Sequence, residues 1–502
     1  MLLHSITQLT ISVALALLAP YTALAQPQAE VVSIDVRATG RPFPHFWEQM
    51  FGSERAIVSL RESYKDDLRG VKQITNFRYV RFHGVLMDEV GVYDEDKKGQ
   101  SVYNFSYIDQ IYDGLLANGV RPFVELSFMP TKLAARQAIH FFWYHPNVSP
   151  PKDLNKWEDL IYQLGKHLVE RYGEDEVAQW YFEVWNEPNI HFWAGEPKQS
   201  TYFDLYSRSA RALKRVSSRL RVGGPATAEA AWVPEFIRWT VHSNVPLDFV
   251  STHVYGNNDP AKMLGVEEKL TREEIVCRAV RIVHDQVTAS PRPDLPIIWS
   301  EFNASYEDNP QVLDTTYIGP WLASVISQCE GLSTMLSFWT FSDVFEEGGV
   351  VKEPFHGGFG LYAVGHIPKP SFNAFALLHQ LGTERLTVSS KSVLATRTDD
   401  GRVVIALWNL LPAEVSGPEK NIRLRFAGIS KNSKVLIQRL DEDHGNVLTA
   451  YEQMGRPRYP TQAQLSALRN AAKLSPLEVR RLKTNELQLT LQPHSLVLLE
   501  IR

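Results

Sequence analysis

Apolar runs of strand length alternate with helix-like segments between residues 44 and 382. The strand-like runs lie at 46–52, 77–83, 121–128, 179–187, 221–225, 247–255, 295–302 and 334–341. Each is followed by a segment with apolar residues at helical spacing, at 58–74, 106–119, 153–173, 199–218, 231–243, 271–289, 316–330 and 370–381. Strict alternation of this kind indicates parallel strands joined by helical crossovers. We therefore predict an α/β fold, a closed (β/α)8 TIM barrel with long loops, over residues 38–382. An open doubly wound sheet is disfavoured, because no Gly-x-Gly-x-x-Gly turn follows the first strand.

A different pattern begins after residue 382. Short β-rich runs, separated by polar turns, lie at 392–397, 402–410, 421–426, 434–439, 486–491 and 496–501. A helical stretch from Thr461 to Ala472 interrupts them. Residues 383–502 are therefore predicted to form a C-terminal antiparallel β-sandwich that carries a small helical insertion. The short strand at 30–37 precedes the barrel and is expected to join the sandwich.

The first 25 residues have the features of a signal peptide. An apolar run from Ile6 to Pro20 is followed by Ala23-Leu-Ala25, a small-x-small cleavage pattern. The run is too short to span a bilayer, and no other segment has the length and apolarity of a membrane span. We therefore expect residues 1–25 to be removed on export to the periplasm or the medium. An N-terminal anchor is the alternative, since the residues before the run include no Lys or Arg.

Composition excludes several functional classes. A net charge of −5 over 502 residues provides no basic surface for nucleic acid. Only Cys277 and Cys329 occur, so there is no disulfide framework and no zinc-binding cysteine pattern. We expect two buried thiols, and a single bridge between them is left open. The histidines are scattered, without His-Glu-x-x-His, and no nucleotide-binding loop occurs, so neither a metal nor a cofactor is predicted.

Two glutamates, Glu187 and Glu301, end the fourth and seventh predicted strands. In a (β/α)8 barrel these strands lie on opposite sides of the mouth, where the chemistry gathers. Hydrolysis of a glycosidic bond needs such a facing pair, one carboxyl to protonate the leaving oxygen and one to attack or activate water. We predict Glu187 as general acid/base and Glu301 as nucleophile; structural or helix-capping acids are the alternatives. Trp185 and Asn186 would limit the solvation of Glu187 and raise its pKa, and Asn186 is a predicted substrate contact.

Two further strands add residues to this site. Arg81 and His83 alternate at the end of the second strand and therefore share one face. Arg81 could support a catalytic carboxylate or form a structural ion pair beneath the pocket, and His83 could bind a sugar hydroxyl. His253 and Tyr255 share a face at the end of the sixth strand, where they are placed to surround Glu301. A lone histidine is more often a core residue, but beside two acids we predict His253 and Tyr255 as substrate contacts.

The eighth strand is expected to supply the pocket floor. Trp339 ends this strand, and Glu346 and Glu347 follow in the next loop. Carboxylates are strong acceptors for sugar hydroxyls, so both acids are predicted to bind substrate; two solvated loop acids are the alternative. Asn303 and Tyr306, which follow the seventh strand, are predicted as a supporting residue and a substrate contact.

The motifs that contain these residues resemble glycoside hydrolase family 39, the family of β-xylosidases and α-L-iduronidases. The resemblance covers nearly the whole chain after the signal peptide. It rests on Tyr79-Val-Arg-Phe-His-Gly84, Pro122-Phe-Val-Glu-Leu-Ser-Phe-Met-Pro130, Phe182-Glu-Val-Trp-Asn-Glu-Pro-Asn189, Thr252-His-Val-Tyr255, Trp299-Ser-Glu-Phe-Asn303, Phe338-Trp-Thr-Phe-Ser-Asp-Val-Phe-Glu-Glu347, His356-Gly-Gly-Phe-Gly-Leu361 and Arg439-Leu-Asp-Glu-Asp-His-Gly-Asn446.

The resemblance implies a barrel with a β-sandwich and hydrolysis with retained configuration through a covalent glycosyl-enzyme. Glu187 would be the acid/base and Glu301 the nucleophile. An iduronidase needs a cation near the uronate, whereas Glu346 and Glu347 suit neutral hydroxyls, although Lys352 follows closely. We therefore expect an exo-acting β-D-xylosidase on xylo-oligosaccharides. The alternatives are an α-L-arabinosidase, an α-L-iduronidase, an endo-acting polysaccharide hydrolase or a non-catalytic sugar-binding protein, and a homo-oligomer is left open.

Overall fold

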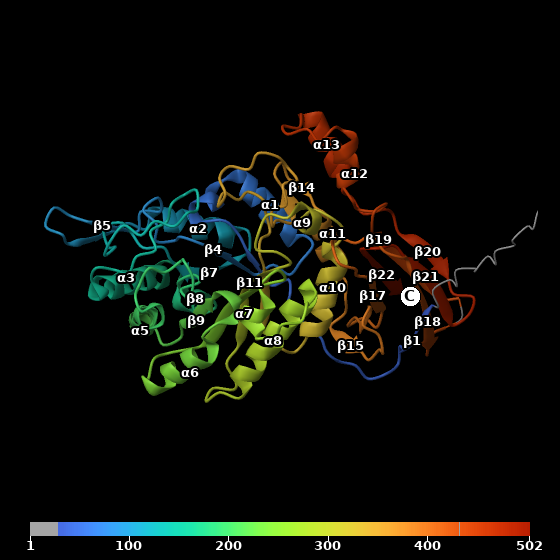
Figure 1. The fold of residues 1–502 in the computed structure, drawn as a ribbon, viewed down its shortest axis with the longest axis horizontal. Helices are drawn as coiled ribbons and strands as arrows, with labels where there is room; N and C mark the ends of the chain where they lie inside the picture. Colours follow the sequence, from blue (N-terminus) through green and yellow to red (C-terminus); the bar gives the residue numbers. More distant parts are fainter. Residues whose placement is uncertain (1–28, 431) are drawn as a thin grey trace, which may run out of the picture.

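The computed structural model describes residues 29–430 and 432–502, so the predicted signal peptide lies outside the described residues. The predicted (β/α)8 barrel is confirmed: parallel strands form one closed barrel, in which β12 pairs with β3. The barrel fills one side of the molecule and the β-sandwich the other (Figure 1). The barrel strands are β3 (Met50–Gly52), β4 (Tyr79–Phe82), β7 (Arg121–Leu126), β8 (Tyr181–Val184), β9 (Arg221–Thr227), β10 (Phe249–Tyr255), β11 (Ile297–Asn303) and β12 (Met335–Phe338).

The predicted crossover helices are all present, with ends shifted by a few residues. They are α1 (Glu62–Lys72), α2 (Ser106–Ala117), α3 (Leu154–Tyr172), α5 (Lys198–Val216), α6 (Val233–His242), α8 (Arg272–Thr288), α10 (Ile318–Cys329) and α11 (Pro370–Leu378). The first helix begins at Glu62 rather than residue 58, because the extended Arg61 separates it from the 3-10 helix η1 (Ala56–Leu60). Helix α3 shows why apolar spacing predicted these helices. Its buried residues lie on one helical face and include Trp157, Leu160, Ile161, Leu164 and Leu168.

Short elements lie in the loops between the barrel strands. They are the β5–β6 hairpin (Tyr93–Glu95 and Ser101–Tyr103), β13 (Tyr362–Ala363), β14 (Ile367–Pro368), α4 (Glu174–Val177), η2 (Ala228–Ala230), α7 (Pro260–Leu264) and α9 (Pro310–Leu313). None of them belongs to the barrel wall. All of them except α4, which precedes β8 at the amino end of the barrel, lengthen the loops that surround its mouth.

The barrel interior changes from apolar to ionic along the strands. Met50, Phe123 and Ile298 are buried together at its amino end. Two residues after Phe123 on the same strand comes Glu125, which is fully buried, as is Arg81 on β4. Because alternate residues of a strand face the same side, one strand contributes to both layers. The charged layer therefore rests on a packed apolar base.

The remaining strands form the predicted β-sandwich. One sheet has the order β2-β15-β16-β17-β22-β19-β20 and the other β1-β18-β21. Their bounds are β1 (Glu30–Asp35), β2 (Arg41–Pro42), β15 (Glu384–Leu386), β16 (Val393–Arg397), β17 (Val403–Asn409), β18 (Lys420–Ala427), β19 (Lys434–Leu440), β20 (Glu478–Arg481), β21 (Glu486–Leu491) and β22 (Ser495–Ile501). As expected, the N-terminal strand joins this unit. It runs parallel to β18, so the sandwich is not entirely antiparallel, and β2, which was expected within the barrel, pairs with β15.

The helical insertion lies between β19 and β20 and contains α12 (Leu448–Gln453) and α13 (Gln462–Ala471). It projects at the edge of the molecule (Figure 1). Its residues Tyr451 and Leu468 are buried in a small cluster with Phe355 and Ile367 from the segment after β12. The insertion therefore packs against loops that follow the last barrel strand.

Cys277 on α8 and Cys329 on α10 are buried, unlinked thiols whose Sγ atoms lie 3.2 Å apart. Across the described residues, none of the helices has both the length and the apolarity to cross a membrane.

We predict that Leu440→Ala weakens the junction between barrel and sandwich. Leu440 is fully buried and packs closely against Gly319 on α10. A Cβ added at this glycine would lie only 2.9 Å from Leu440 Cδ2. The cavity left by truncation should lower the free energy of unfolding by about 2–4 kcal/mol, measured by urea denaturation followed by circular dichroism. The control Leu477→Ala, at a site that is 49% exposed, should change it little. Equal stability of the two variants would show that this junction contributes little to folding.

Candidate active site

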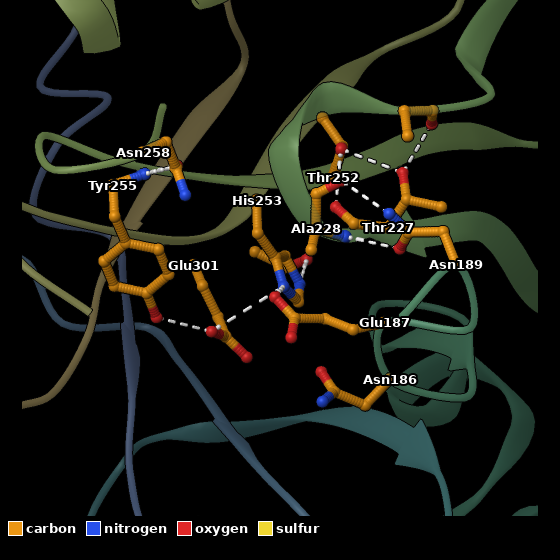
Figure 2. A network of polar contacts seen from close by, with 12 residues as sticks. Asn186, Glu187, Asn189, Thr227, Ala228, Thr252, His253, Tyr255, Asn258 and Glu301 are labelled. Atoms are coloured by element: carbon orange, nitrogen blue, oxygen red, sulfur yellow. Dashed lines mark hydrogen bonds and ion pairs between the residues drawn. The ribbon is translucent and has the colours of Figure 1, made fainter. Parts of the chain in front are cut away.

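Glu187 and Glu301 meet at the barrel mouth, at the carboxyl ends of β8 and β11. One carboxylate oxygen from each lies within 4.8 Å of the other and of a ring nitrogen of His253. That nitrogen, Nδ1, is 2.9 Å from Glu187 Oε1 and 3.6 Å from Glu301 Oε2. Figure 2 shows His253 between the two acids, with Tyr255 on the far side of Glu301. The two acids singled out from the sequence thus face each other across a short gap.

The backbone around Glu187 differs from the prediction. Strand β8 ends at Val184, so Glu187 lies in the following loop rather than at the end of the strand. Its φ is 43° and that of Trp185 is 72°, a left-handed conformation that non-glycine residues rarely adopt. Two contacts hold this turn: Glu187 N donates to Ala226 O, and the Asn189 amide exchanges hydrogen bonds with the backbone of Ala228 (Figure 2). The neighbouring strand β9 therefore fixes the position of the acid.

Glu301 accepts two strong hydrogen bonds. Arg81 Nη1 donates to Oε1 at 2.7 Å and the Tyr255 hydroxyl donates to Oε2 at 2.5 Å. Hydrogen bonds to a carboxylate from a cation or an acidic hydroxyl stabilise its negative charge. This environment suits a nucleophile.

Glu187 has the opposite environment. Burial and the neighbouring charge of Glu301 raise the pKa of Glu187 well above its ordinary value, although His83 and Arg81 act in the other direction. A raised carboxyl pKa keeps a proton available near neutral pH, which a general acid requires. The site therefore presents a proton donor opposite an anion.

Arg81 is the centre of a buried ionic cluster. Besides Glu301, its guanidinium contacts Glu183 Oε2 at 2.6 Å, Glu125 Oε2 at 2.8 Å and Asn186 Oδ1 at 2.9 Å. The three glutamates surround one cation, so Arg81 pairs with Glu301 and also forms buried ion pairs with Glu125 and Glu183. Glu125 and Glu183 were not predicted. The sequence does contain a sign of both residues, since each is an acid within an otherwise apolar barrel strand. Such a side chain is expected to point into a polar barrel interior.

Strand β11 contains an irregularity that matters for the site. Its register with β10 shifts so that Thr252 pairs with Trp299 and His253 pairs with Glu301, which leaves Ser300 without a partner. An extra residue of this kind re-aims side chains. Ser300 Oγ bonds Glu183 and Glu301 bonds Arg81, so two consecutive residues reach the barrel interior.

His83 and Glu347 form a second polar pair at the cavity wall. His83 Nδ1 is 2.8 Å from Glu125 and Nε2 is 3.5 Å from Glu347. Although burial opposes the charge, these carboxylates raise the pKa of His83 to about 10. Burial raises the pKa of Glu347 to about 7, against the effect of His83. A charged donor and a titrating carboxyl thus lie side by side where a substrate would bind.

A cavity of about 540 Å³ opens above the two acids. Of the residues predicted from sequence, its lining includes Glu187, Glu301, His83, Asn186, Tyr255, Tyr306, Trp339 and Glu347. Residues that were not predicted complete it: Phe141, Phe142, Ile190, His191, Phe192, Ala228, Glu229, Asn258, Lys262, Glu307 and Phe359. Most of these belong to long loops, whose course leaves no local signal in the sequence.

Two of the predicted substrate contacts lie outside the lining of this cavity. Glu346 does not line the cavity; its carboxylate pairs with Arg55 at 3.0 Å and Arg61 at 2.5 Å. His253 is fully buried beneath the cavity and contacts the catalytic candidates instead. Asn303, predicted to support the site, is buried and donates to the backbone carbonyl of Trp339, which holds the end of β12.

Two groups of side chains in the described part of the chain bring possible metal ligands together. They are Glu187–His253–Glu301 and His45–Glu48–His379. In the first, Arg81 already neutralises Glu301. In the second, at the amino end of the barrel, Glu48 pairs with both histidines at 2.8 and 2.9 Å. Hydrogen bonds within the protein account for both groups, and we assign neither to a metal.

Comparison with known proteins agrees with this geometry. The model of the family described as glycosyl hydrolases family 39 matches residues 30–485. A beta-xylosidase of Geobacillus stearothermophilus is 39% identical over 483 residues, which cover 93% of this chain and 95% of that protein. The crystal structure of a monomeric beta-xylosidase from Caulobacter crescentus CB15 matches with a TM-score of 0.85 and 34% identity, covering 94% of this chain and 99% of the other. An alpha-L-iduronidase of Homo sapiens is 27% identical over 41% of this chain and 31% of its own length.

We predict that Arg81→Met strongly destabilises the protein. The substitution removes the cation from three buried carboxylates, and leaving buried charges uncompensated should lower the free energy of unfolding by about 3–5 kcal/mol. The measurement is urea denaturation, with Arg208→Met as control, because Arg208 is paired at the surface with Glu158. If Arg81→Met were as stable as the control, the three acids would have to be neutralised by other means.

Proposed function

Because the chain belongs to glycosyl hydrolases family 39, we propose that this glycoside hydrolase is a retaining, exo-acting β-D-xylosidase that releases xylose from the non-reducing ends of xylo-oligosaccharides. The observation that carries the mechanism is the short separation of Glu187 and Glu301, whose nearest oxygens lie within 4.8 Å. Carboxyl groups about 5–5.5 Å apart are typical of retaining enzymes, whereas inverting enzymes leave about 6.5–9.5 Å for a water molecule. This spacing supports double displacement.

In the first step Glu301 attacks the anomeric carbon while Glu187 gives its proton to the leaving glycosidic oxygen. A covalent glycosyl-enzyme forms, and the aglycone leaves with that proton. In the second step the ionised Glu187 takes a proton from a water molecule, which attacks the anomeric carbon and releases Glu301. Arg81 and Tyr255 stabilise the charge that returns to Glu301.

The charges around the cavity support a neutral sugar. Its lining includes the acids Glu229, Glu307 and Glu347 in addition to the catalytic pair. Its lysine, Lys262, pairs with Glu229 at 2.5 Å, and His83 is engaged by Glu125. Among the described residues that line this cavity, each of these cations already has an acidic partner, so a uronate carboxylate would meet repulsion here. Glu347 and these further acids, rather than Glu346, therefore disfavour a uronate.

The first cavity continues into a second cavity of about 450 Å³. It shares Phe141, Phe142, Tyr306, Glu347 and Phe359 with the first. Phe141 is 72% exposed, so an apolar ring stands free at this boundary. Aromatic faces of this kind suit the faces of further sugar units, which supports an oligosaccharide substrate.

We predict that wild-type protein cleaves 4-nitrophenyl β-D-xyloside in preference to the α-L-arabinoside, β-D-glucoside and α-L-iduronide. Glu301→Ala should reduce the rate by at least about 10³-fold, because the covalent step is lost. NMR should detect the β-anomer of xylose as the first product. The control Glu235→Ala removes an exposed acid on α6 and should leave the rate unchanged. Equal rates for Glu301→Ala and wild type would refute the assignment, and the α-anomer appearing first would refute retention.

We predict that Glu187→Ala affects substrates according to their leaving group. A 2,4-dinitrophenyl xyloside needs no proton to depart, whereas xylobiose does, so xylobiose hydrolysis should fall much further. Steady-state kcat/KM for both substrates provides the measurement. Identical losses on the two would argue against an acid/base role for Glu187.

A further inference from the structure

A chain of buried hydrogen bonds connects Glu187 to the ionic cluster. Glu187 Oε1 is 2.9 Å from His253 Nδ1, and His253 Nε2 is 3.1 Å from Ser300 Oγ. Ser300 Oγ donates to Glu183 Oε1 at 2.6 Å. Arg81 Nε donates to the other oxygen of Glu183, also at 2.6 Å. Four elements, β4, β8, β10 and β11, contribute to this chain.

The chain has a direction, because a serine hydroxyl carries one proton. Ser300 donates this hydrogen to Glu183 Oε1. Burial raises the pKa of Glu183, and Arg81, bonded to its other oxygen, favours the ionised form that accepts here. Toward His253 the hydroxyl can then only accept, so Nε2 of His253 carries a hydrogen. Both distances agree with this assignment: a hydroxyl bound to a carboxylate is short, and an N–H bound to a neutral oxygen is longer.

His253 is neutral, since burial and the cations Arg81 and His83 lower its pKa well below the ordinary value. With hydrogen on Nε2, a neutral imidazole has a bare Nδ1 that can only accept. Glu187 must therefore supply the proton in their shared hydrogen bond, which requires its carboxyl to be protonated. The remaining charged or titratable groups that face Glu187 are Glu301, Tyr255, His83, Arg81 and Glu347.

We propose that Ser300 and Glu183 are positioning residues that hold His253 in its Nε2–H form, so that its bare Nδ1 stabilises the protonated acid of Glu187. This inference rests on the proposed acid/base role of Glu187. In the first step Glu187 gives its proton to the glycosidic oxygen, and its new carboxylate then faces a bare nitrogen. That repulsion makes Glu187 a stronger base, which favours removal of a proton from water in the second step. The irregular register of β11 serves this arrangement, because it lets Ser300 and Glu301 both reach the interior.

Ser300→Ala tests the proposal without changing any charge. Without the hydroxyl, Nε2 loses its acceptor, and His253 can move its hydrogen to Nδ1 and donate to ionised Glu187. In the pH dependence of kcat/KM for phenyl β-D-xyloside, the basic limb should therefore shift down by about half to one pH unit, the size expected for one lost hydrogen bond. Ser300→Thr, which keeps the hydroxyl, should retain the wild-type limb.

The matched control is Ser337→Ala on β12, since Ser337 is equally buried and its hydroxyl has no hydrogen-bond partner within the described part of the chain. Its pH profile should superimpose on that of wild type, whereas a purely structural effect of removing a barrel serine would appear in both variants. If Ser300→Ala does not fold, Ser300→Val and Ser300→Thr form an isosteric pair that differs only in the hydroxyl.

Glu187→Ala, measured beside these variants, distinguishes the acid/base role of Glu187 from the positioning role of Ser300. If it shows the leaving-group dependence but Ser300→Ala keeps the wild-type basic limb, the acid/base role stands and the role of Ser300 is overturned. If Glu187→Ala shows no leaving-group dependence, both are overturned. A lowered basic limb in Ser300→Ala, absent from Ser337→Ala and Ser300→Thr, supports the inference.

Discussion

The geometry of the site depends on one buried guanidinium. Arg81 lies in the barrel with no exposure to solvent and is surrounded by Glu125, Glu183 and Glu301. Removing several charges from water is expensive, and the arrangement is tolerated because every charge has an opposite partner and further hydrogen bonds. Since those partners come from β7, β8 and β11, the same interactions fix the relative positions of four strands. The geometry of the catalytic pair follows from this constraint.

The cluster also makes the two catalytic carboxyls unequal. Glu301 accepts hydrogen bonds from a cation and a hydroxyl group, whereas Glu187 is hydrogen-bonded to a neutral histidine. Two carboxyls this close cannot both ionise easily, and their surroundings decide which of them keeps the proton. Ser300, inserted by the irregular register of β11, connects the ionic cluster to the histidine and so links the two environments. One hydrogen-bonded network therefore sets the environments of both the acid and the nucleophile.

The outer parts of the molecule are connected to this centre through the loops that follow β12. The sandwich packs on α10 through Leu440, and its helical insertion packs against loops that follow β12. Those loops continue into the segment that supplies Glu347 and Phe359 to the cavity. The long loop after β7 adds Phe141 and Phe142. A rigid barrel therefore holds the chemistry, and the loops form the surface that meets the rest of the substrate.

Local patterns in the sequence determined the barrel strands, the crossover helices and the two catalytic candidates, because periodicity and strand ends are properties of neighbouring residues. The tertiary structure alone decided three other features. The N-terminal strand runs parallel to β18, a pairing across nearly four hundred residues that no local pattern encodes. Glu346 turns away to Arg55 and Arg61 while adjacent Glu347 enters the cavity, since in an irregular loop partners rather than alternation set direction. Ser300 reaches the interior only through a register shift, which depends on the neighbouring strand and so exists only once the barrel has closed.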